Sequence, residues 1–308
     1  MSKIAFIFPG QGAQTFGMGK DFYERHEGSQ RIFEEASEIT EINIAGLCFE
    51  ENDFLNITEY TQVAVLTTSI AILEASKDYN ITPSVCAGLS LGEYSALVAS
   101  GALEFNQACH IVRQRGIFMQ DAVPVGLGAM AAVLSLEVNK IEEVCSKIEG
   151  VEIANYNCPG QIVISGEKEA VKEAGQLLLD LGAKRVVMLN VSGPFHSSML
   201  KDAGKKLATL LESISFHKPH IPYVTNVTGE YVKEMGQIKE FLEKQVYSPV
   251  RWQQGIEAMI AEGVDTFIEI GPGKSLSAFV KKIDSTKRIL NIEKFEDMEK
   301  VALEVGKC

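Results

Sequence analysis

A change of pattern between the middle of the chain and its two flanks constrains the fold most. Between residues 126 and 190, apolar and amphipathic segments follow the order strand, helix, strand, strand, helix, strand, which is typical of a ferredoxin-like unit. In the flanks, short apolar strands alternate with helical segments, a pattern that predicts a mainly parallel sheet with helices on both faces. We therefore expect an α/β protein with a large domain of residues 1–125 and 191–308. A small ferredoxin-like subdomain, residues 126–190, is inserted into it.

Hydrophobic periodicity and Gly or Pro stops predict the individual elements. Residues 20–80 have a mainly helical pattern. In the flanks we expect strands at 3–8, 83–88, 223–227 and 266–270, and helices at 93–100, 104–122, 198–213, 236–246 and 252–262, with a further helix after Gly271-Pro-Gly273. In the middle segment we expect strands at 128–134, 151–156, 161–165 and 185–189, and helices at 136–148 and 167–181.

Charge and hydropathy exclude several classes of protein. The formal net charge of −12 over 308 residues disfavours nucleic acid as a partner. The first apolar run stops at Pro9 and Gly10 and is too short for a secretion signal, and no apolar stretch approaches the roughly 18 residues that span a bilayer. We therefore expect a cytoplasmic protein that does not insert into membranes.

The cysteines give no sign of a disulfide framework or a metal site. They are scattered through the chain without a C-x-x-C pair, and we expect free thiols and no bound metal. The six positions are Cys48, Cys86, Cys109, Cys145, Cys158 and Cys308.

The strongest local motif is Gly88-Leu-Ser90-Leu-Gly92, which fits G-x-S-x-G. It follows a predicted strand and precedes a predicted helix, where this motif forms a sharp turn that exposes a nucleophilic serine. The start of the helix adds free backbone N–H groups and the positive end of a dipole. A Gly-rich turn in which Ser90 only caps the helix is the plainer alternative. The strand-turn-helix context favours a catalytic serine.

A serine nucleophile needs a base, and the chain has five histidines. His196 stands out because it lies in a Gly-Pro loop that leaves a predicted strand end, where catalytic groups gather in α/β proteins. His26, His217 and His220 lie among polar or charged residues, and His110 lies within a helix. His196 is therefore our candidate base.

Arg115 is the anomaly of the predicted helix at 104–122. It lies three residues after Val112 and four before Met119, within an apolar stripe at helical spacing. A guanidinium on a buried face needs an anionic partner. The partner is either a structural carboxylate, such as Glu93, or a carboxylate of the substrate, to which arginine can donate two parallel hydrogen bonds.

Two glycine-containing segments invite a nucleotide interpretation that the spacing does not support. Residues 10–15 lack the third glycine of a dinucleotide fingerprint, and Gly273-Lys-Ser275 lacks the earlier P-loop glycine, whose place Ile268 takes. The loop Phe8-Pro-Gly-Gln-Gly-Ala-Gln14 instead offers backbone N–H groups that can help hold an oxyanion.

Taken in order, these motifs resemble those of the malonyl-CoA:acyl carrier protein transacylases and the acyltransferase domains of fatty acid and polyketide synthases. The resemblance spans almost the whole chain. It is carried by the N-terminal Gly loop 8–14, the serine motif 88–93, the arginine segment 115–120, the middle segment 153–166, the histidine loop 193–196, and the segments 245–252 and 269–274.

The resemblance implies a role for each matching residue. Ser90 would be the nucleophile and His196 its base, and the backbone carbonyl of Gln245 would orient the histidine. The resemblance alone points to Gln245, because nothing in its local sequence marks it as functional. The fold implied is an α/β-hydrolase-like core with the ferredoxin-like subdomain inserted, and with the active site in the cleft between them.

Further positions complete the implied site. The backbone N–H groups of Gln11 and Leu91 would form the oxyanion hole, and Arg115 would bind the malonyl carboxylate. Phe195 lies where related polyketide acyltransferases that prefer malonyl over methylmalonyl have an aromatic residue. The chain departs from the family at Leu89, where histidine is usual, which leaves the nucleophile and the oxyanion donors in place.

The reaction implied is a two-step transfer from malonyl-CoA to acyl carrier protein through a malonyl-serine ester, without a metal or redox cofactor. We expect a monomer. The alternatives are an acyltransferase that loads a polyketide synthase, a serine esterase or thioesterase that uses water, and a non-catalytic scaffold. Because carrier proteins are acidic, docking on this acidic chain would need a local basic patch, for which Lys201, Lys205 and Lys206 are the candidates.

Overall fold

The large sheet explains why the flanks of the chain read as alternating strands and helices. The computed structural model describes residues 3–124, 126–191 and 193–306. Five strands lie in the order β7-β2-β1-β8-β9 and all neighbours are parallel. Their bounds are β1 Ile4–Phe8, β2 Val85–Gly88, β7 Tyr223–Val224, β8 Thr266–Ile270 and β9 Arg288–Ile292. The predicted α/β class with a mainly parallel sheet is confirmed.

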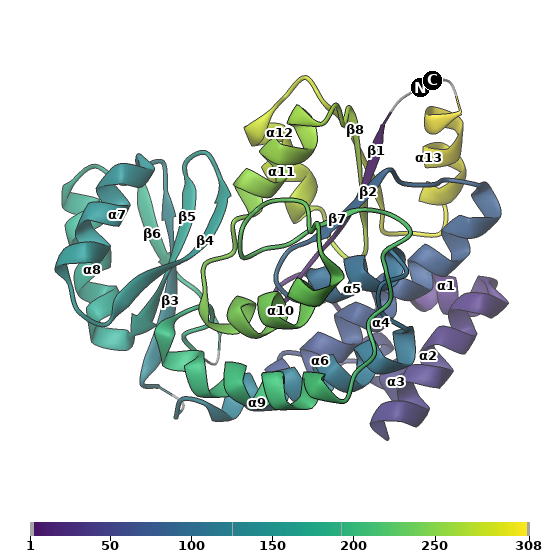
Figure 1. Ribbon diagram of the computed structural model, residues 1–308, viewed down its shortest axis with the longest axis horizontal. Helices are drawn as coiled ribbons and strands as arrows, with labels where there is room; N and C mark the ends of the chain where they lie inside the picture. Colours follow the sequence, from purple (N-terminus) through teal and green to yellow (C-terminus); the bar gives the residue numbers. More distant parts are fainter. Residues whose placement is uncertain (1–2, 125, 192, 307–308) are drawn as a thin grey trace.

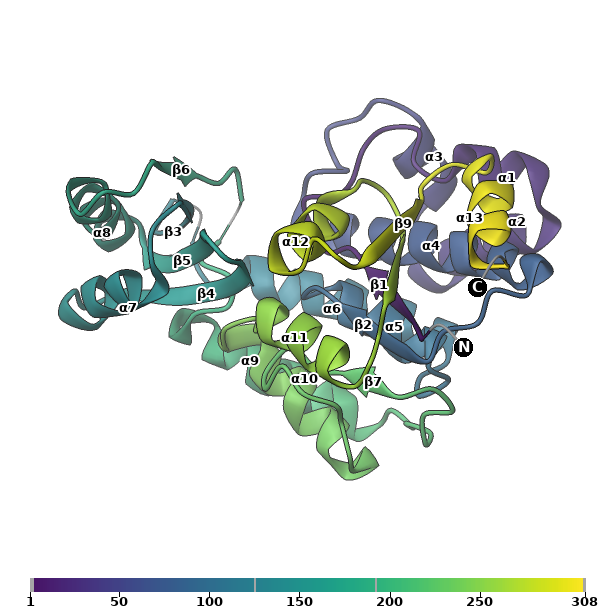
Figure 2. The same cartoon turned by 90° about the horizontal axis from the view of Figure 1, so that it is seen from above.

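Helices cover both faces of this sheet (Figures 1 and 2). In β1, Phe6 and Phe8 join the cluster formed with α4 and α6, whereas Ala5 and Ile7 join the cluster with α11 and α12. The helices of this part are α1 Lys20–Arg25, α2 Glu27–Thr40, α3 Ile44–Phe49, α4 Thr58–Ser76, η1 Lys77–Tyr79, α5 Gly92–Ala99, α6 Phe105–Asp121, η2 Ser198–Leu200, α9 Lys201–Glu212, η3 Met235–Gln237, α10 Ile238–Tyr247, α11 Trp252–Ala261, α12 Ser275–Ile283 and α13 Asp297–Val305.

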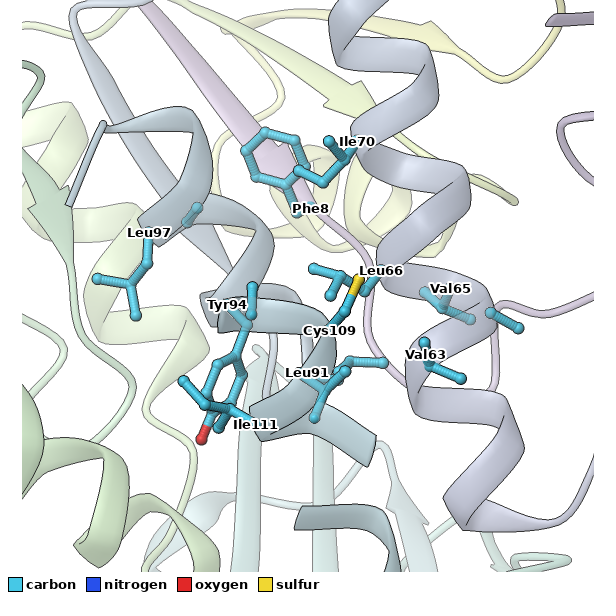
Figure 3. Packing of buried hydrophobic residues seen from close by; sticks show 14 of the residues in the cluster. Phe8, Val63, Val65, Leu66, Ile70, Leu91, Tyr94, Leu97, Cys109 and Ile111 are labelled. Atoms are coloured by element: carbon cyan, nitrogen blue, oxygen red, sulfur yellow. The ribbon is translucent and has the colours of Figure 1, made fainter. Parts of the chain in front are cut away.

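The helix α4 is the centre of the larger core. It packs against α2, α5 and α6, so apolar side chains leave it in every direction rather than from one stripe. Figure 3 shows Val63, Leu66 and Ile70 of this helix beside Phe8 of β1 and Leu91 at the start of α5. This packing fixes the positions of the chain segments that carry Ser90 and Arg115.

A second sheet forms the inserted segment, at the left of Figure 1. It is antiparallel, with the order β4-β5-β3-β6, and α7 and α8 pack on its outer face. Its other face contributes Met130 and Val163 to the larger core. The bounds are β3 Gly128–Leu134, α7 Val138–Lys147, β4 Val151–Cys158, β5 Gln161–Glu167, α8 Lys168–Asp180 and β6 Arg185–Met188. This order is that of the predicted ferredoxin-like unit.

Some predicted elements were wrong in length or missing. The strand predicted at 223–227 ends at Val224, because Asn226 binds the neighbouring serine turn instead of extending the sheet. We did not predict β9 or α13, because the C-terminal sequence that forms them is polar and has weak hydrophobic periodicity. The division into domains 1–125 with 191–308 and 126–190 stays a prediction, and residues 1–2, 125, 192 and 307–308 lie outside the described residues.

Two further expectations can be compared with the described part of the chain. Cys48, Cys86, Cys109, Cys145 and Cys158 are free thiols, and Cys308 lies outside that part. None of the described helices combines the length and the apolarity that crossing a bilayer would require.

Candidate active site

Ser90 lies on a tight turn between β2 and α5 and has a positive φ of 53°. Such strain in a non-glycine residue persists only where the surroundings impose it, and it is frequent at functional sites. A Cβ atom on Gly88 would lie 1.9 Å from the Gly92 carbonyl oxygen, and one on Gly92 would lie 2.1 Å from that of Phe8. The two glycines are therefore needed for the close approach that makes the turn.

Asn226 holds this turn from the end of β7. Its Oδ1 accepts a 2.5 Å hydrogen bond from the Ser90 backbone N–H, and its Nδ2 donates to the Gly88 carbonyl at 2.7 Å. Sequence reasoning missed Asn226 as a site residue. The available signal was a polar residue near the C-terminal end of a predicted strand, since parallel strands end at the same edge of a sheet.

The structure brings Ser90, His196 and Gln245 together. The Ser90 Oγ and His196 Nε2 atoms are 2.8 Å apart, and His196 Nδ1 lies 2.7 Å from the backbone carbonyl oxygen of Gln245. Because a carbonyl can only accept, Nδ1 carries the proton and Nε2 is free to accept one from the serine. Burial, reinforced by the positive charge of Arg115, lowers the pKa of His196 to about 4. The imidazole is therefore neutral at physiological pH and suited to act as a base.

The other four histidines lie outside this cluster. His26 caps the start of α2 by accepting from the Ser29 N–H. His110, His217 and His220 are exposed on the surface. Position in the fold thus separates His196 from the rest, as its loop context predicted.

Arg115 is buried, with 1% of its surface exposed, and it points at the serine. Its Nη2 donates to Ser90 Oγ at 3.3 Å and to Gln245 Oε1 at 2.9 Å, and its Nη1 donates to Gln62 Oε1 at 2.8 Å. Throughout residues 3–124, 126–191 and 193–306, no carboxylate lies within salt-bridge distance of this guanidinium, and its Nε has no hydrogen-bond partner.

The structural salt bridge to Glu93 that we considered from the sequence is therefore not formed. Glu93 Oε2 instead accepts from Gln245 Nε2 at 2.6 Å and from the Asn226 backbone N–H at 3.1 Å. Gln62 and Glu93 are site residues that sequence reasoning did not assign. The signal for both was a polar residue within a run that is otherwise apolar.

The two predicted oxyanion donors come from separate segments of the chain. Leu91 is buried at the start of α5, and Gln11 follows β1 with its side chain donating to Thr58 Oγ1 at 3.2 Å. Within the described chain, neither backbone N–H group donates a hydrogen bond. Two N–H groups without acceptors beside a nucleophile are suited to stabilise a negatively charged oxygen.

A cavity of about 340 Å³ joins these groups to the small sheet. Its polar lining comes from both parts of the fold: Gln11, Ser90, Arg115, His196 and Ser275 from the large part, and Asn155 and Asn157 from the small sheet. Its remaining wall is mostly apolar and comes from both sheets: Leu89, Met119, Met130, Val163, Leu189, Val191, Phe195, Leu276 and Phe279. The cavity therefore suits a small acyl group that carries one negative charge.

A serine on a strand-helix turn, with a neutral histidine and an adjacent arginine, defines an enzyme of the serine-nucleophile class. Within that class, the chain belongs to the acyl transferase domain family, whose model matches residues 5–302. The predicted resemblance to this family is confirmed.

Individual relatives are similar over nearly their whole length. The chain is 49% identical over 304 residues to a malonyl CoA-acyl carrier protein transacylase of Bacillus subtilis, covering 97% of this chain and 96% of the relative. The crystal structure of the corresponding transacylase of Clostridium perfringens superimposes with a TM-score of 0.96 at 45% identity, covering 99% and 98% of the two chains. A malonyl-transacylase in complex with a type II PKS acyl-carrier protein matches with a TM-score of 0.95 at 39% identity, covering 99% and 100%.

Proposed function

We propose that this protein transfers a malonyl group from malonyl-CoA to acyl carrier protein in fatty acid synthesis. The observation that carries the proposal is the Arg115 guanidinium, which lies 3.3 Å from Ser90 Oγ and has no carboxylate within salt-bridge distance in the described chain. A substrate with a free carboxylate supplies the missing anion. The relatives at 49% and 45% identity, both malonyl CoA-acyl carrier protein transacylases, support this substrate.

The first half-reaction forms an ester on the enzyme. Ser90 Oγ attacks the thioester carbonyl while His196 Nε2 takes its proton, and the N–H groups of Gln11 and Leu91 stabilise the oxyanion. Collapse of this intermediate breaks the C–S bond. The coenzyme A thiolate leaves with the proton from His196, and malonyl-Ser90 remains.

The second half-reaction uses the same groups in reverse. The phosphopantetheine thiol of the carrier protein gives its proton to His196 and attacks the malonyl-Ser90 carbonyl. The serine oxygen leaves and recovers the proton, so the enzyme returns to its starting state. Both half-reactions are balanced without a metal or a redox cofactor.

The same groups could in principle serve an esterase or a thioesterase with water as the acceptor. Arg115 argues against an esterase for fatty chains, because such a pocket has no use for a buried cation beside the nucleophile. A carrier protein of polyketide synthesis would require the same chemistry. Comparing transfer to carrier proteins of the two pathways distinguishes these acceptors, and we expect the fatty acid carrier to be preferred.

The remaining parts of the proposal concern the protein as a whole. It acts as a monomer in the cytoplasm, and the inserted segment 126–190 forms one wall of the cleft. The cavity lining, which comes from both sheets, supports this division of roles. Analytical ultracentrifugation with and without malonyl-CoA measures the mass of the protein in solution, and we expect the mass of one chain in both cases.

Mass spectrometry of the intact protein tests the acyl-enzyme. We expect one malonyl group on the wild-type protein after mixing with malonyl-CoA, and its loss on adding holo carrier protein. The variant Ser90→Ala removes the nucleophile and should take up no label while keeping its melting temperature. Labelling of that variant at the wild-type level would refute Ser90 as the acyl carrier.

A further inference from the structure

Glu93 is a buried carboxylate for which the two half-reactions have no use. It lies on α5 three residues after Ser90 and has no exposed surface. One of its oxygens, Oε2, accepts hydrogen bonds from the Gln245 side chain and from the Asn226 backbone. These two partners come from α10 and from the end of β7, so one carboxylate joins three separate parts of the chain.

Each partner of Glu93 in turn holds a catalytic group. Asn226 binds the Ser90 N–H through its side chain, and Gln245 binds His196 through its backbone carbonyl. The Gln245 Nε2 also donates to the Ser90 carbonyl at 3.0 Å. Glu93 itself lies one contact away from both members of the Ser90–His196 pair.

Charge fixes the orientation of the Gln245 amide. Its oxygen accepts from the Arg115 guanidinium and its nitrogen donates to Glu93. Rotating the amide by half a turn would place its NH₂ group against the guanidinium and its oxygen against the carboxylate. Two repulsive contacts would replace two charge-assisted hydrogen bonds, so a single orientation is stable.

We propose that Glu93 is a positioning residue for acyl transfer, which aligns Ser90 with His196 by holding Asn226 and Gln245. The inference deepens the proposed function and rests on it for the identity of the acyl group. Catalysis depends on alignment to within a fraction of an ångström, and a displacement of about 1 Å can cost about 100-fold in rate.

The surroundings of Glu93 make its charge sensitive to pH. Burial raises its pKa to about 7, although the nearby Thr225 hydroxyl, the hydrogen bonds from Asn226 and Gln245 and the charge of Arg115 on α6 act in the opposite direction. The other titratable groups that face it are Tyr94 on its own helix and Tyr223 on β7. Protonation of Glu93 below about pH 7 therefore removes the charge that orients Gln245.

Replacement of Glu93 tests the proposal in the full-length protein. The variants are Glu93→Gln, which keeps the shape and loses the charge, and Glu93→Ala, which loses both hydrogen bonds. Rates are measured for acylation by malonyl-CoA, acylation by acetyl-CoA and sulfonylation of Ser90 by phenylmethanesulfonyl fluoride. We expect all three rates to fall by the same factor, about 10-fold in Glu93→Gln and about 100-fold in Glu93→Ala.

The pH dependence separates a positioning role from a merely structural one. The Glu93→Gln variant should be slowest relative to wild type at about pH 8, and the two rates should converge near pH 5.5, where wild-type Glu93 is protonated. As a control, Ser29→Ala removes a buried hydrogen bond from α2 to the Ala71 carbonyl and should lower the melting temperature without changing the rates.

Three results would overturn the proposal. Folded Glu93 variants could react at wild-type rates, or only their acylation by malonyl-CoA could be slower. The ratio of the Glu93→Gln rate to the wild-type rate could also be independent of pH. If Glu93→Ala does not fold, Glu93→Gln alone decides. Failure of wild-type protein to take up malonyl would refute the proposed function instead, while the sulfonylation rates would still test the role of Glu93.

Discussion

At the scale of single residues, we expect Arg115 to decide which acyl group enters. Replacing it by alanine removes the cation that a malonyl carboxylate would pair with. Leaving one member of a buried charge pair alone costs about 3–5 kcal/mol, so malonyl kcat/KM should fall by a factor of about 100 or more. Acetyl transfer should change little. Arg115→Lys should also be impaired, since an ammonium cannot make two parallel hydrogen bonds.

Arg113 on the same helix provides a matched control. It forms an ion pair with Glu59 at 2.5 Å and lies over the Tyr60 ring, and it does not line the cavity. Arg113→Ala should leave the malonyl-to-acetyl ratio of kcat/KM unchanged. The same unchanged ratio in Arg115→Ala, accompanied by a lower melting temperature, would show that Arg115 is structural.

We expect Phe195 to limit the size of the acyl group. Its ring is buried in the cavity wall next to His196, which leaves little room for a methyl branch on the malonyl carbon. One methyl group in such a pocket is worth about 1–3 kcal/mol, so malonyl should be preferred over methylmalonyl by roughly 10–200-fold. Phe195→Ser should narrow this preference. Equal kcat/KM values for the two thioesters in the wild-type protein would contradict the assignment.

The sequence predicted residues whose signal is local. Ser90 is marked by its glycines, His196 by its loop and Arg115 by its place in an apolar stripe, and all three meet in the cavity. Asn226 could not be predicted in the same way, because its partner Ser90 is 136 residues away. Gln245 was accessible only through the family resemblance. The side chain of Gln245 is buried, and its partners Arg115, Ser90 and Glu93 lie on α6, on the serine turn and on α5. None of these contacts leaves a mark in the sequence around Gln245.

At the scale of elements, α9 is the candidate surface for the carrier protein. Lys201, Lys205 and Lys206 are exposed on it, directly after the His196 loop. An acidic partner should be attracted to a basic patch, and this attraction weakens with salt. Charge reversal of Lys201 and Lys206 to Glu should slow transfer to the carrier protein several-fold without changing acylation by malonyl-CoA.

Lys205 and Lys300 offer a matched pair for this experiment. Each forms an ion pair with an aspartate three residues earlier, Lys205 with Asp202 at 2.9 Å and Lys300 with Asp297 at 3.4 Å. Lys205→Glu should slow carrier transfer, and Lys300→Glu on α13 should not. Equal effects of both changes would mean that net charge, rather than the α9 patch, governs docking.

The elements that the sequence predicted well are those with a clear period. The strand at 128–134 and the strand at 266–270 have the predicted bounds, because each is a mainly apolar run with a sharp end. The strand β9 was missed because four of its five residues are only partly buried and polar residues interrupt the run. The strand β7 was overestimated because a contact with a distant turn, invisible in the local sequence, ends it early.

At the scale of the whole molecule, Glu93 lowers stability at neutral pH. Its pKa rises from 4.5 to about 7 on folding, so its contribution is most favourable below pH 4.5 and is lost as the pH rises through 7. The loss amounts to about 3 kcal/mol. His196, with its pKa lowered to about 4, acts in the opposite direction and destabilises the fold as the pH falls from 6.5.

The two contributions can be separated by comparing wild type with Glu93→Gln. The free energy of unfolding of the variant, relative to wild type, should be higher at about pH 8 than at about pH 4.5 by about 3 kcal/mol. Urea denaturation at the two pH values measures this difference, and His196 cancels because both proteins contain it. A difference that does not vary with pH would show that the Glu93 pKa is not raised. If the expected difference is found, Glu93→Gln combines slower catalysis with higher stability at about pH 8, a common compromise at active sites.

The order of strands in the large sheet has a consequence for biosynthesis. The strand β1 is made first but lies between β2 and β8, and Ser90 is held by residues 226 and 245. A ribosome releases a chain from its N-terminus, and contacts between distant residues form only after both have emerged. A nascent or prematurely terminated chain that lacks residues 226–270 therefore contains Ser90 and His196 without Asn226, without the Gln245 carbonyl that orients the histidine, and without the strand β8 beside β1. We therefore expect such incomplete copies of the protein not to consume malonyl-CoA.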